Sequence, residues 1–394
     1  MSLIARAINE ARLAKSRLKH KTVRFKVSDL SRFYSNLNAA GITYVVLRWA
    51  DEIPFSIEAE RSYSRDIDHL VATGNLDTIC RIASAQPGPV SVDFYTATGE
   101  RGGAYRRMPY YMPSLAETIL ARRVRLPSGI WVPCPEDALL SFVYHLIYHK
   151  GCNSGIPSGL DLATIDHPAR DYATEARRLA QLAGLALPEP ITLLNLHDFL
   201  KAHGWSMALD LMPRWQDQHA LIGALQALEN ERAAALLKRV ADITLFIVRE
   251  DPIGEQGLGL IRERIGERFT ILAEIVLDPE AQRRLMTRTR GGDWSSKGCN
   301  QPNRPTRVLI CRNASEPGAL PGRMTAAKAK RRYPHITTTD VLIKRDIRKE
   351  VATTMGLGRI CNVLHATDNP LEGLEALRAI HGPGFTAALE RLSC

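Results

Sequence analysis

The sequence lacks paired cysteines and long apolar runs. Its seven cysteines are scattered over 394 residues and form no C-x-x-C pair, which disfavours a disulfide framework and a zinc site. No apolar run reaches the roughly 18 residues that a membrane-spanning helix needs, so we expect a cytoplasmic protein with reduced thiols. Walker A, Rossmann glycine, H-E-x-x-H and G-x-S-x-G motifs are also missing. The sequence therefore gives no support to the nucleotide, metal and acyl-transfer chemistry that these motifs indicate.

Basic residues are concentrated at the N-terminus. The formal net charge is +10, yet residues 1–26 alone carry eight Lys or Arg and a single Glu. Leucines and isoleucines among these charges predict an amphipathic helix in a basic arm. Such an arm would pack on the first domain, or it would contact a polyanion or a membrane surface. Nucleic acid is not the expected partner, because the rest of the chain is nearly neutral.

The spacing of apolar residues predicts an α/β (α+β) chain in four parts. After the arm (1–26), residues 27–150 alternate helix and strand patterns that are typical of a mixed-sheet domain. Residues 151–240 have helical periodicity almost throughout. Residues 241–394 begin with a β-α-β-α-β order that is typical of a ferredoxin-like α/β sandwich.

The first candidate site consists of aspartates on two predicted strands. Asp66 and Asp68 are separated by one residue, so a strand would direct both carboxylates to one face, about 6–7 Å apart along the chain. Asp93 lies in the middle of the next predicted strand and could supply a third. Like charges this close favour a divalent cation, and Mg²⁺ prefers carboxylate and phosphate oxygens. The alternative is a solvated D-x-D on an edge strand.

Three segments place these aspartates in a wider pattern. They are Arg65-Asp66-Ile67-Asp68-His69-Leu70-Val71, Val92-Asp93-Phe94 and Pro135-Glu136-Asp137-Ala138-Leu139-Leu140. Over roughly residues 27–150 the order resembles that of the polymerase-β-like nucleotidyltransferases. The resemblance implies that Asp66, Asp68 and Asp93 are catalytic and bind Mg²⁺. It also implies an NTP substrate, with ATP expected, and transfer of its NMP to a hydroxyl of a small molecule or sugar.

The segment after the first predicted strand departs from that family. The family carries Gly-Ser or Gly-Gly there, whereas Leu47 is followed here by Arg48 and Trp49. Arg48 would then bind phosphate through its side chain, or it would form a surface salt bridge. His145 and His149, four residues apart on a later predicted helix, would contact the acceptor or be ordinary helix histidines.

The second candidate site surrounds His365. This histidine follows an apolar segment and precedes polar residues in Arg359-Ile360-Cys361-Asn362-Val363-Leu364-His365-Ala366-Thr367-Asp368. An imidazole that is held at one ring nitrogen can accept a phosphoryl group at the other. Further segments in the same region are Val248-Arg249-Glu250-Asp251, Ile347-Arg348-Lys349 and Asn369-Pro370-Leu371-Glu372-Gly373.

In this order the segments resemble the nucleoside diphosphate kinases across residues 242–394. The resemblance implies a catalytic His365. It also implies nucleotide binding by Arg249, Arg348, Asn362 and Thr367. Trp294 would stack on a base or lie in the core.

Three functions remain open from the sequence. The first is a Mg²⁺-dependent nucleotidyltransferase with a kinase-like nucleotide-binding domain. The second is a phosphotransferase that works through a phosphohistidine at His365. The third is a catalytically silent nucleotide sensor or scaffold whose basic arm binds a polyanion.

Overall fold

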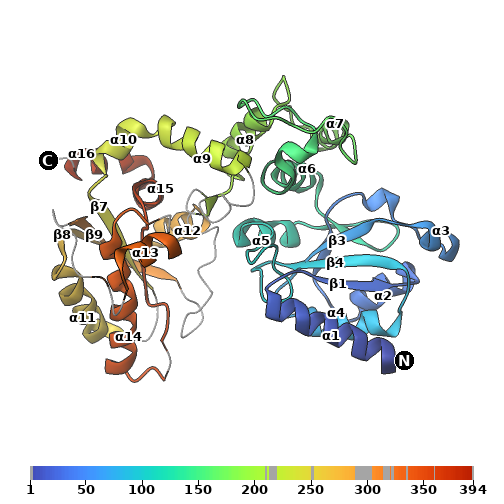
Figure 1. Ribbon diagram of the computed structural model, residues 1–394, viewed down its shortest axis with the longest axis horizontal. Helices are drawn as coiled ribbons and strands as arrows, with labels where there is room; N and C mark the ends of the chain where they lie inside the picture. The colour runs from blue at the N-terminus through green and yellow to red at the C-terminus, as the bar shows by residue number, and fades with distance from the viewer. Residues whose placement is uncertain are drawn as a thin grey trace. The chain divides into compact units, whose positions relative to one another are not determined.

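The computed structural model describes residues 3–208, 211–212, 220–249, 253–288, 304–313, 320, 324–333, 336–358 and 360–392. It has a mixed α/β fold in two compact units, Met1–Met207 and Ala208–Cys394 (Figure 1). The predicted helical region 151–240 is divided between them. Within the described residues, no helix is both long and apolar enough to cross a membrane.

The first unit is built on one four-stranded sheet. Its strands are β1 (Val23–Val27), β2 (Tyr44–Val46), β3 (Asp66–Val71) and β4 (Val90–Thr96), and a small hairpin adds β5 (Val124–Arg125) and β6 (Trp131–Val132). The helices are α1 (Leu3–Lys19), α2 (Leu30–Ala39), α3 (Ile57–Ser62), α4 (Leu76–Ala85), α5 (Pro113–Ala121), α6 (Pro135–Tyr144), α7 (Tyr172–Ala183) and α8 (Leu193–Ala202). The strand order is β1-β4-β3-β2, with β3 and β4 parallel at the centre and antiparallel neighbours at both edges.

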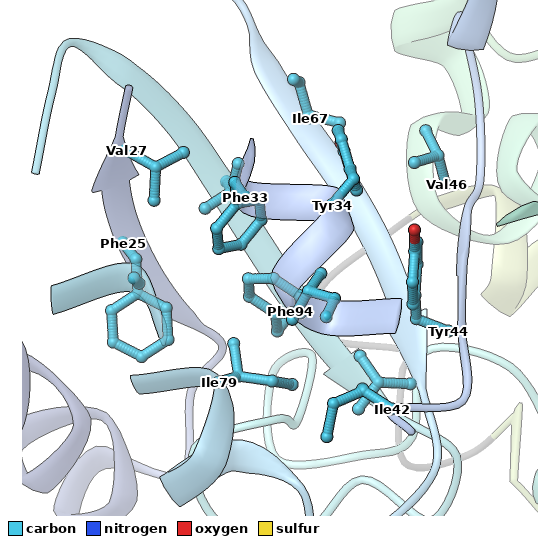
Figure 2. Packing of buried hydrophobic residues seen from close by; sticks show 14 of the residues in the cluster. Phe25, Val27, Phe33, Tyr34, Ile42, Tyr44, Val46, Ile67, Ile79 and Phe94 are labelled. Atoms are coloured by element: carbon cyan, nitrogen blue, oxygen red, sulfur yellow. The ribbon is translucent and has the colours of Figure 1, made fainter. Parts of the chain in front are cut away.

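One face of this sheet buries an aromatic core. Strand residues alternate between the two faces, and Phe25, Ile67 and Phe94 point toward α2 and α4. Figure 2 shows Phe33 of α2 and Ile79 of α4 packed among them. All five side chains have at most 2% of their surface exposed. The other face is therefore the one that remains for polar side chains of β1, β3 and β4.

The local sequence explains where the helices begin. Asp29 caps α2 by accepting a hydrogen bond from the backbone N–H of Arg32 at 3.1 Å. α6 begins with Pro135 in its first turn, and Glu136 and Asp137 follow it there. A proline has no N–H to leave unpaired at that position, and acidic side chains interact favourably with the positive end of the helix dipole. His145–Lys150 continues α6 as a π-helix.

The predicted basic arm is not separable from the sheet. The proposed boundary after residue 26 falls inside β1, whose residues pair with β4 from Val23 to Val27. α1 runs alongside α4 (Figure 1), and Leu13 is buried in the core. Residues 23–27 alternate apolar and basic side chains, which is a strand pattern. The positive charge of residues 1–26 instead suggested a basic arm. The simpler expectation, a helix that packs on the first domain, holds for α1.

The second unit contains a four-stranded, fully antiparallel sheet in the order β10-β7-β9-β8. Its strands are β7 (Ile243–Arg249), β8 (Phe269–Val276), β9 (Pro305–Asn313) and β10 (Leu364–Ala366). The helices are α9 (Ala220–Arg232), α10 (Ala234–Arg239), α11 (Gly254–Gly266), α12 (Pro279–Arg288), α13 (Ala326–Arg332), α14 (Lys344–Thr354), α15 (Pro370–His381) and α16 (Phe385–Leu392).

Helices cover both faces of the second sheet. Leu245 and Ile247 of β7 join a core with α12 and α15, whereas Phe246 and Val248 join a second core with α11 and α14. Leu364 and Ala366 belong to this second core. Because neighbouring residues of a strand face opposite ways, His365 between them points to the α15 side.

Candidate functional site

The three predicted aspartates lie together on the face of the first sheet that is opposite the aromatic core. Asp68 of β3 and Asp93 of β4 are direct neighbours in the parallel register. Asp66 is two residues before Asp68 on the same strand and shares its face. Asp93 is buried, whereas Asp66 is exposed and Asp68 is half-buried. The cluster is therefore open to solvent at its Asp66 end.

Two arginines form ion pairs with this carboxylate cluster. Arg24 of β1 donates to both oxygens of Asp93, at 2.8 Å from Nε and 2.7 Å from Nη2. Its Nη2 also lies 2.6 Å from Oδ2 of Asp66. Arg48, which follows β2, places its Nη2 2.6 Å from Oδ2 of Asp68. Three negative charges thus face two positive ones.

Arg24 is the residue that the sequence interpretation missed here. It was assigned to the basic arm, yet its Cα is the register partner of Asp93 in the β1–β4 pairing. The salt bridge that was one expectation for Arg48 is present, but it does not lie at the surface, because the Arg48 side chain is only 5% exposed. Arg48 also lies over the ring of Tyr110, 5.4 Å from the ring centre.

A buried histidine holds the two central strands in register behind the carboxylates. His69 points into the aromatic core, where its ring stacks on Phe94 with 4.5 Å between centres. Its Nδ1 lies 3.2 Å from the carbonyl oxygen of Asp93 and must donate to it, so Nε2 accepts from the hydroxyl of Tyr34 at 2.9 Å. The ring is thereby fixed in one neutral tautomer. Burial lowers the pKa of His69 to about 4, which agrees with that assignment.

Burial also acts on Asp93. It raises the pKa of this carboxyl above its usual value, and the facing Arg24 opposes the shift without cancelling it. The neighbouring Asp68 and Asp66 raise it further. A carboxylate with a raised pKa is a stronger proton acceptor than one in water. Asp93 is therefore suited to remove a proton from a hydroxyl group that enters the cluster.

His145 and His149, expected to contact the acceptor or to be ordinary helix histidines, are both buried. Nδ1 of His145 is 2.7 Å from the hydroxyl of Tyr110. The ring of His149 stacks on Tyr110 with 4.0 Å between centres. Burial holds the pKa of His145 well below its usual value. Tyr110 therefore connects these rings to Arg48 and, through it, to the carboxylates.

The cluster has the chemistry of a divalent-cation site. It offers carboxylate oxygens from three side chains on adjacent strands, which are the ligands that Mg²⁺ prefers. The guanidinium of Arg24 already bridges Asp66 and Asp93, so this face attracts positive charge. With one end exposed, a hydrated cation could approach from the Asp66 side.

In the second unit, His365 is part of a buried polar network. Its Nε2 lies 2.8 Å from Oε1 of Glu372, at the start of α15. Oε2 of the same carboxylate accepts from the backbone N–H of Asp368 at 2.6 Å. Oδ1 of Asp368 is 2.5 Å from Nζ of Lys344, which also donates to the carbonyl of Ala366. The histidine is thus held at one ring nitrogen, as a phosphoryl acceptor requires.

Lys344 was not identified from the sequence, because its partner Asp368 lies 24 residues away in the chain. Burial lowers the pKa of Lys344 even though Asp368 faces it and acts in the opposite direction. The network therefore contains an ion pair, Lys344 with Asp368, in the interior of the second unit.

The predicted nucleotide-binding residues of this unit make contacts within the fold. Oγ1 of Thr367 accepts from the backbone N–H of Leu245 at 3.0 Å. Arg348 donates from Nε to the carbonyl of Leu364 at 2.7 Å. Arg249 and Asn362 are buried. Trp294, expected to stack on a base or lie in the core, lies outside the described residues, as do Glu250, Asp251 and Arg359 of the quoted segments.

No protein-family model, curated protein or solved structure matches this chain.

Proposed function

We propose that the first unit is a Mg²⁺-dependent nucleotidyltransferase that moves an NMP from an NTP, with ATP expected, to a hydroxyl acceptor in the cytoplasm. The observation that carries this proposal is the convergence of Asp66, Asp68 and Asp93 on one face, with Asp68 opposite Asp93 in the register. Bound Mg²⁺ would neutralise the triphosphate and polarise its phosphate oxygens.

Each charged group has a role in this reaction. Asp66 and Asp68 would hold the metal, and Arg48 and Arg24 would bind phosphate oxygens once the carboxylates release their guanidinium groups. The acceptor oxygen attacks the α-phosphorus in line and forms a new P–O bond. The bond from that phosphorus to the bridging oxygen of the β-phosphate breaks, and pyrophosphate leaves with the electron pair. Asp93 takes the proton of the acceptor hydroxyl.

The backbone at Trp49 supports the resemblance at the point where the sequence departs from it. Trp49 has φ 57°, in the left-handed region that favours glycine. The nucleotidyltransferase family carries glycine in this stretch. The turn conformation that a glycine would provide is thus present, with the side chain of Arg48 available for phosphate binding.

The test is transfer of label from α-³²P-labelled NTPs in the presence of Mg²⁺ and a metabolite extract. Asp66→Asn with Asp68→Asn should reduce transfer at least about a thousandfold, because the metal and the substrate lose their ligands together. Asp77→Asn, at an exposed aspartate of the same unit that pairs with Arg17, is the control and should keep full activity. Equal transfer by the double variant and the wild type would overturn the proposal.

A second candidate function belongs to the second unit, a nucleoside diphosphate kinase-type phosphotransferase. The contact between His365 and Glu372 favours it, and the antiparallel order β10-β7-β9-β8 supports a ferredoxin-like sandwich. In this reaction His365 attacks the γ-phosphorus of an NTP, forms a P–N bond, and releases NDP; the phosphoryl group then passes to a second nucleotide.

Incubation with γ-³²P-labelled ATP tests this second function. We expect an acid-labile, alkali-stable label on the protein that His365→Gln abolishes. Absence of label on the wild-type chain would leave the second unit as a nucleotide sensor or scaffold, the remaining alternative. Removing residues 1–26 does not test that alternative cleanly, because the deletion also removes Arg24 and most of β1.

A further inference from the structure

An apolar pocket opens beside the carboxylate cluster in the first unit. Its volume is about 270 Å³. The walls come from the segment after β2, from the β5–β6 hairpin, and from α6 and α7; they include Leu47, Trp49, Leu126, Ala138, Phe142 and Leu179. Trp49 and Phe142 contribute ring edges and faces, with 5.8 Å between their centres. Concave, mostly apolar sites of this kind are typical of small-molecule binding.

The rim of this pocket exposes large apolar side chains. Val124 of β5 is 39% exposed and Leu182 of α7 is 59% exposed, and both line the pocket. Leaving such groups in water forgoes the stabilisation that burial of apolar surface provides. Two of them at one opening indicate a surface that a ligand covers.

Most charged side chains at the pocket are already paired. Glu175 and Arg178 on α7 form their own pair at 2.7 Å, and Arg48 is paired with Asp68. Asp51 is the remaining acidic residue among those that line the pocket. The pocket therefore has no unbalanced cluster of charge that would bind an anionic or a cationic ligand. A neutral ligand gives up the least hydration free energy when it enters.

Arg48 joins the pocket to the carboxylates. It lines the pocket, and its Nη2 contacts Oδ2 of Asp68 at 2.6 Å. A molecule whose apolar part fills the pocket would thus have its adjoining atoms directed along Arg48 toward Asp68 and Asp93. That is where the proposed reaction needs a hydroxyl group.

We propose that this pocket binds the acceptor and that the acceptor is a neutral alcohol with an apolar ring system. The volume is close to the lower end of the usual range for small-molecule sites, about 300 Å³, so it holds one ring system rather than a long chain. The assignment as acceptor rests on the proposed nucleotidyltransferase function. Binding of an apolar ring compound does not.

Binding is tested with the neutral fluorescent probe N-phenyl-1-naphthylamine on the full-length chain. Ala138→Phe fills the pocket from α6 and should weaken probe binding at least tenfold. Gln181→Phe adds the same side chain at an exposed position of α7 that does not line the pocket, and it should change binding less than twofold. Leu182→Asp, at an exposed rim position where the fold tolerates a charge, should weaken binding about as much as Ala138→Phe.

Unchanged binding in both Ala138→Phe and Leu182→Asp would overturn the proposal, as would an equal loss in Gln181→Phe. Transfer assays with 2-naphthalenemethanol and glucose as acceptors distinguish a failure of the pocket proposal from a failure of the proposed transferase function. Transfer to glucose that Ala138→Phe leaves intact would refute the pocket as acceptor site and keep the transferase. Probe binding that Ala138→Phe abolishes, with transfer to neither acceptor, would keep the pocket as an apolar-ring site and count against the transferase.

Discussion

The two units each hold a cluster of opposite charges, and the clusters differ in their access to water. In the first unit, Arg24 and Asp66 have 51% and 38% of their side-chain surface exposed. In the second, Lys344 and Asp368 have only 10% and 12% of their side-chain surface exposed. The charged groups of both clusters pair within the protein, and those of the first cluster are the more accessible to solvent.

Because of this difference, the first cluster can change its ion-pair partners to bind an ion, whereas the second keeps the contacts that it has in the fold. When Arg24 leaves Asp66, water solvates the guanidinium, and exposed ion pairs of this kind contribute only about 0–1 kcal/mol. When a partner leaves the buried network, an uncompensated charge remains in the interior. We therefore expect ligands to bind at the first cluster. We expect substitutions in the second cluster to lower the unfolding free energy most.

The largest effect on stability should come from Lys344→Met. The substitution leaves Asp368 without its buried cation, so the unfolding free energy should fall by about 3–5 kcal/mol. Urea unfolding followed by circular dichroism measures this loss. Adding Asp368→Asn should restore most of it, since both charges are then gone. A loss below 1 kcal/mol in the single variant would contradict the view of this network as a buried ion pair.

A smaller effect should depend on pH through His145. Its pKa in the folded chain lies well below its usual value because of burial, so below about pH 6.5 the unfolded chain binds a proton that the folded chain does not. Stability should therefore fall as the pH drops, by roughly 1.4 kcal/mol per pH unit once the unfolded histidine is protonated.

His145→Gln should reduce this pH slope when unfolding is measured between pH 7 and pH 5. Tyr110→Phe is the matched variant, because it removes the hydrogen bond to the ring and leaves the imidazole in place. It should lower stability at every pH without changing the slope. A slope in His145→Gln equal to that of the wild type would show that the ring does not control the pH dependence.

The smallest effect concerns magnesium and Arg24. In Arg24→Met the carboxylates of Asp66 and Asp93 lose the cation that bridges them, so added Mg²⁺ should bind more tightly than in the wild type. A tenfold tighter site adds about 1.4 kcal/mol at saturation, or a further rise in Tm of roughly 3–5 °C for a unit of this size.

Thermal unfolding with and without 10 mM MgCl₂ measures this difference. Arg17→Met, which removes an exposed pair with Asp77 on α1, should show the wild-type response to Mg²⁺. An Arg24→Met variant that responds to Mg²⁺ no more than the wild type would remove the distinction between the two clusters.

The sequence predicted the aspartate cluster because local rules suffice for it. Asp66 and Asp68 share a face by strand alternation, and the strand-helix-strand pattern that leads to Asp93 makes β3 and β4 neighbours. Most elements of both units could be predicted for the same reason, but β1 and the β5–β6 hairpin were not predicted. Arg24 was missed although its segment alternates like a strand, because the net charge of residues 1–26 suggested a solvated arm.

Other features depend on contacts between distant residues. Helical spacing places His145 and His149 on one side of their helix, but Tyr110, 35 residues before His145, is what buries them. Lys344 meets Asp368 across a similar gap in the chain. The pocket beside Arg48 needs four separate segments to enclose it. No pattern within a single segment predicts such contacts.

The most direct measurement of the central claim is intact-protein and metabolite mass spectrometry after incubation with each NTP, Mg²⁺ and a metabolite extract. The account predicts a product heavier by one NMP, formed by the wild type and lost in the variant with Asp66→Asn and Asp68→Asn. A product that the double variant forms equally well, or no NMP adduct with any NTP, would contradict the assignment of the carboxylate cluster as a nucleotidyltransferase site.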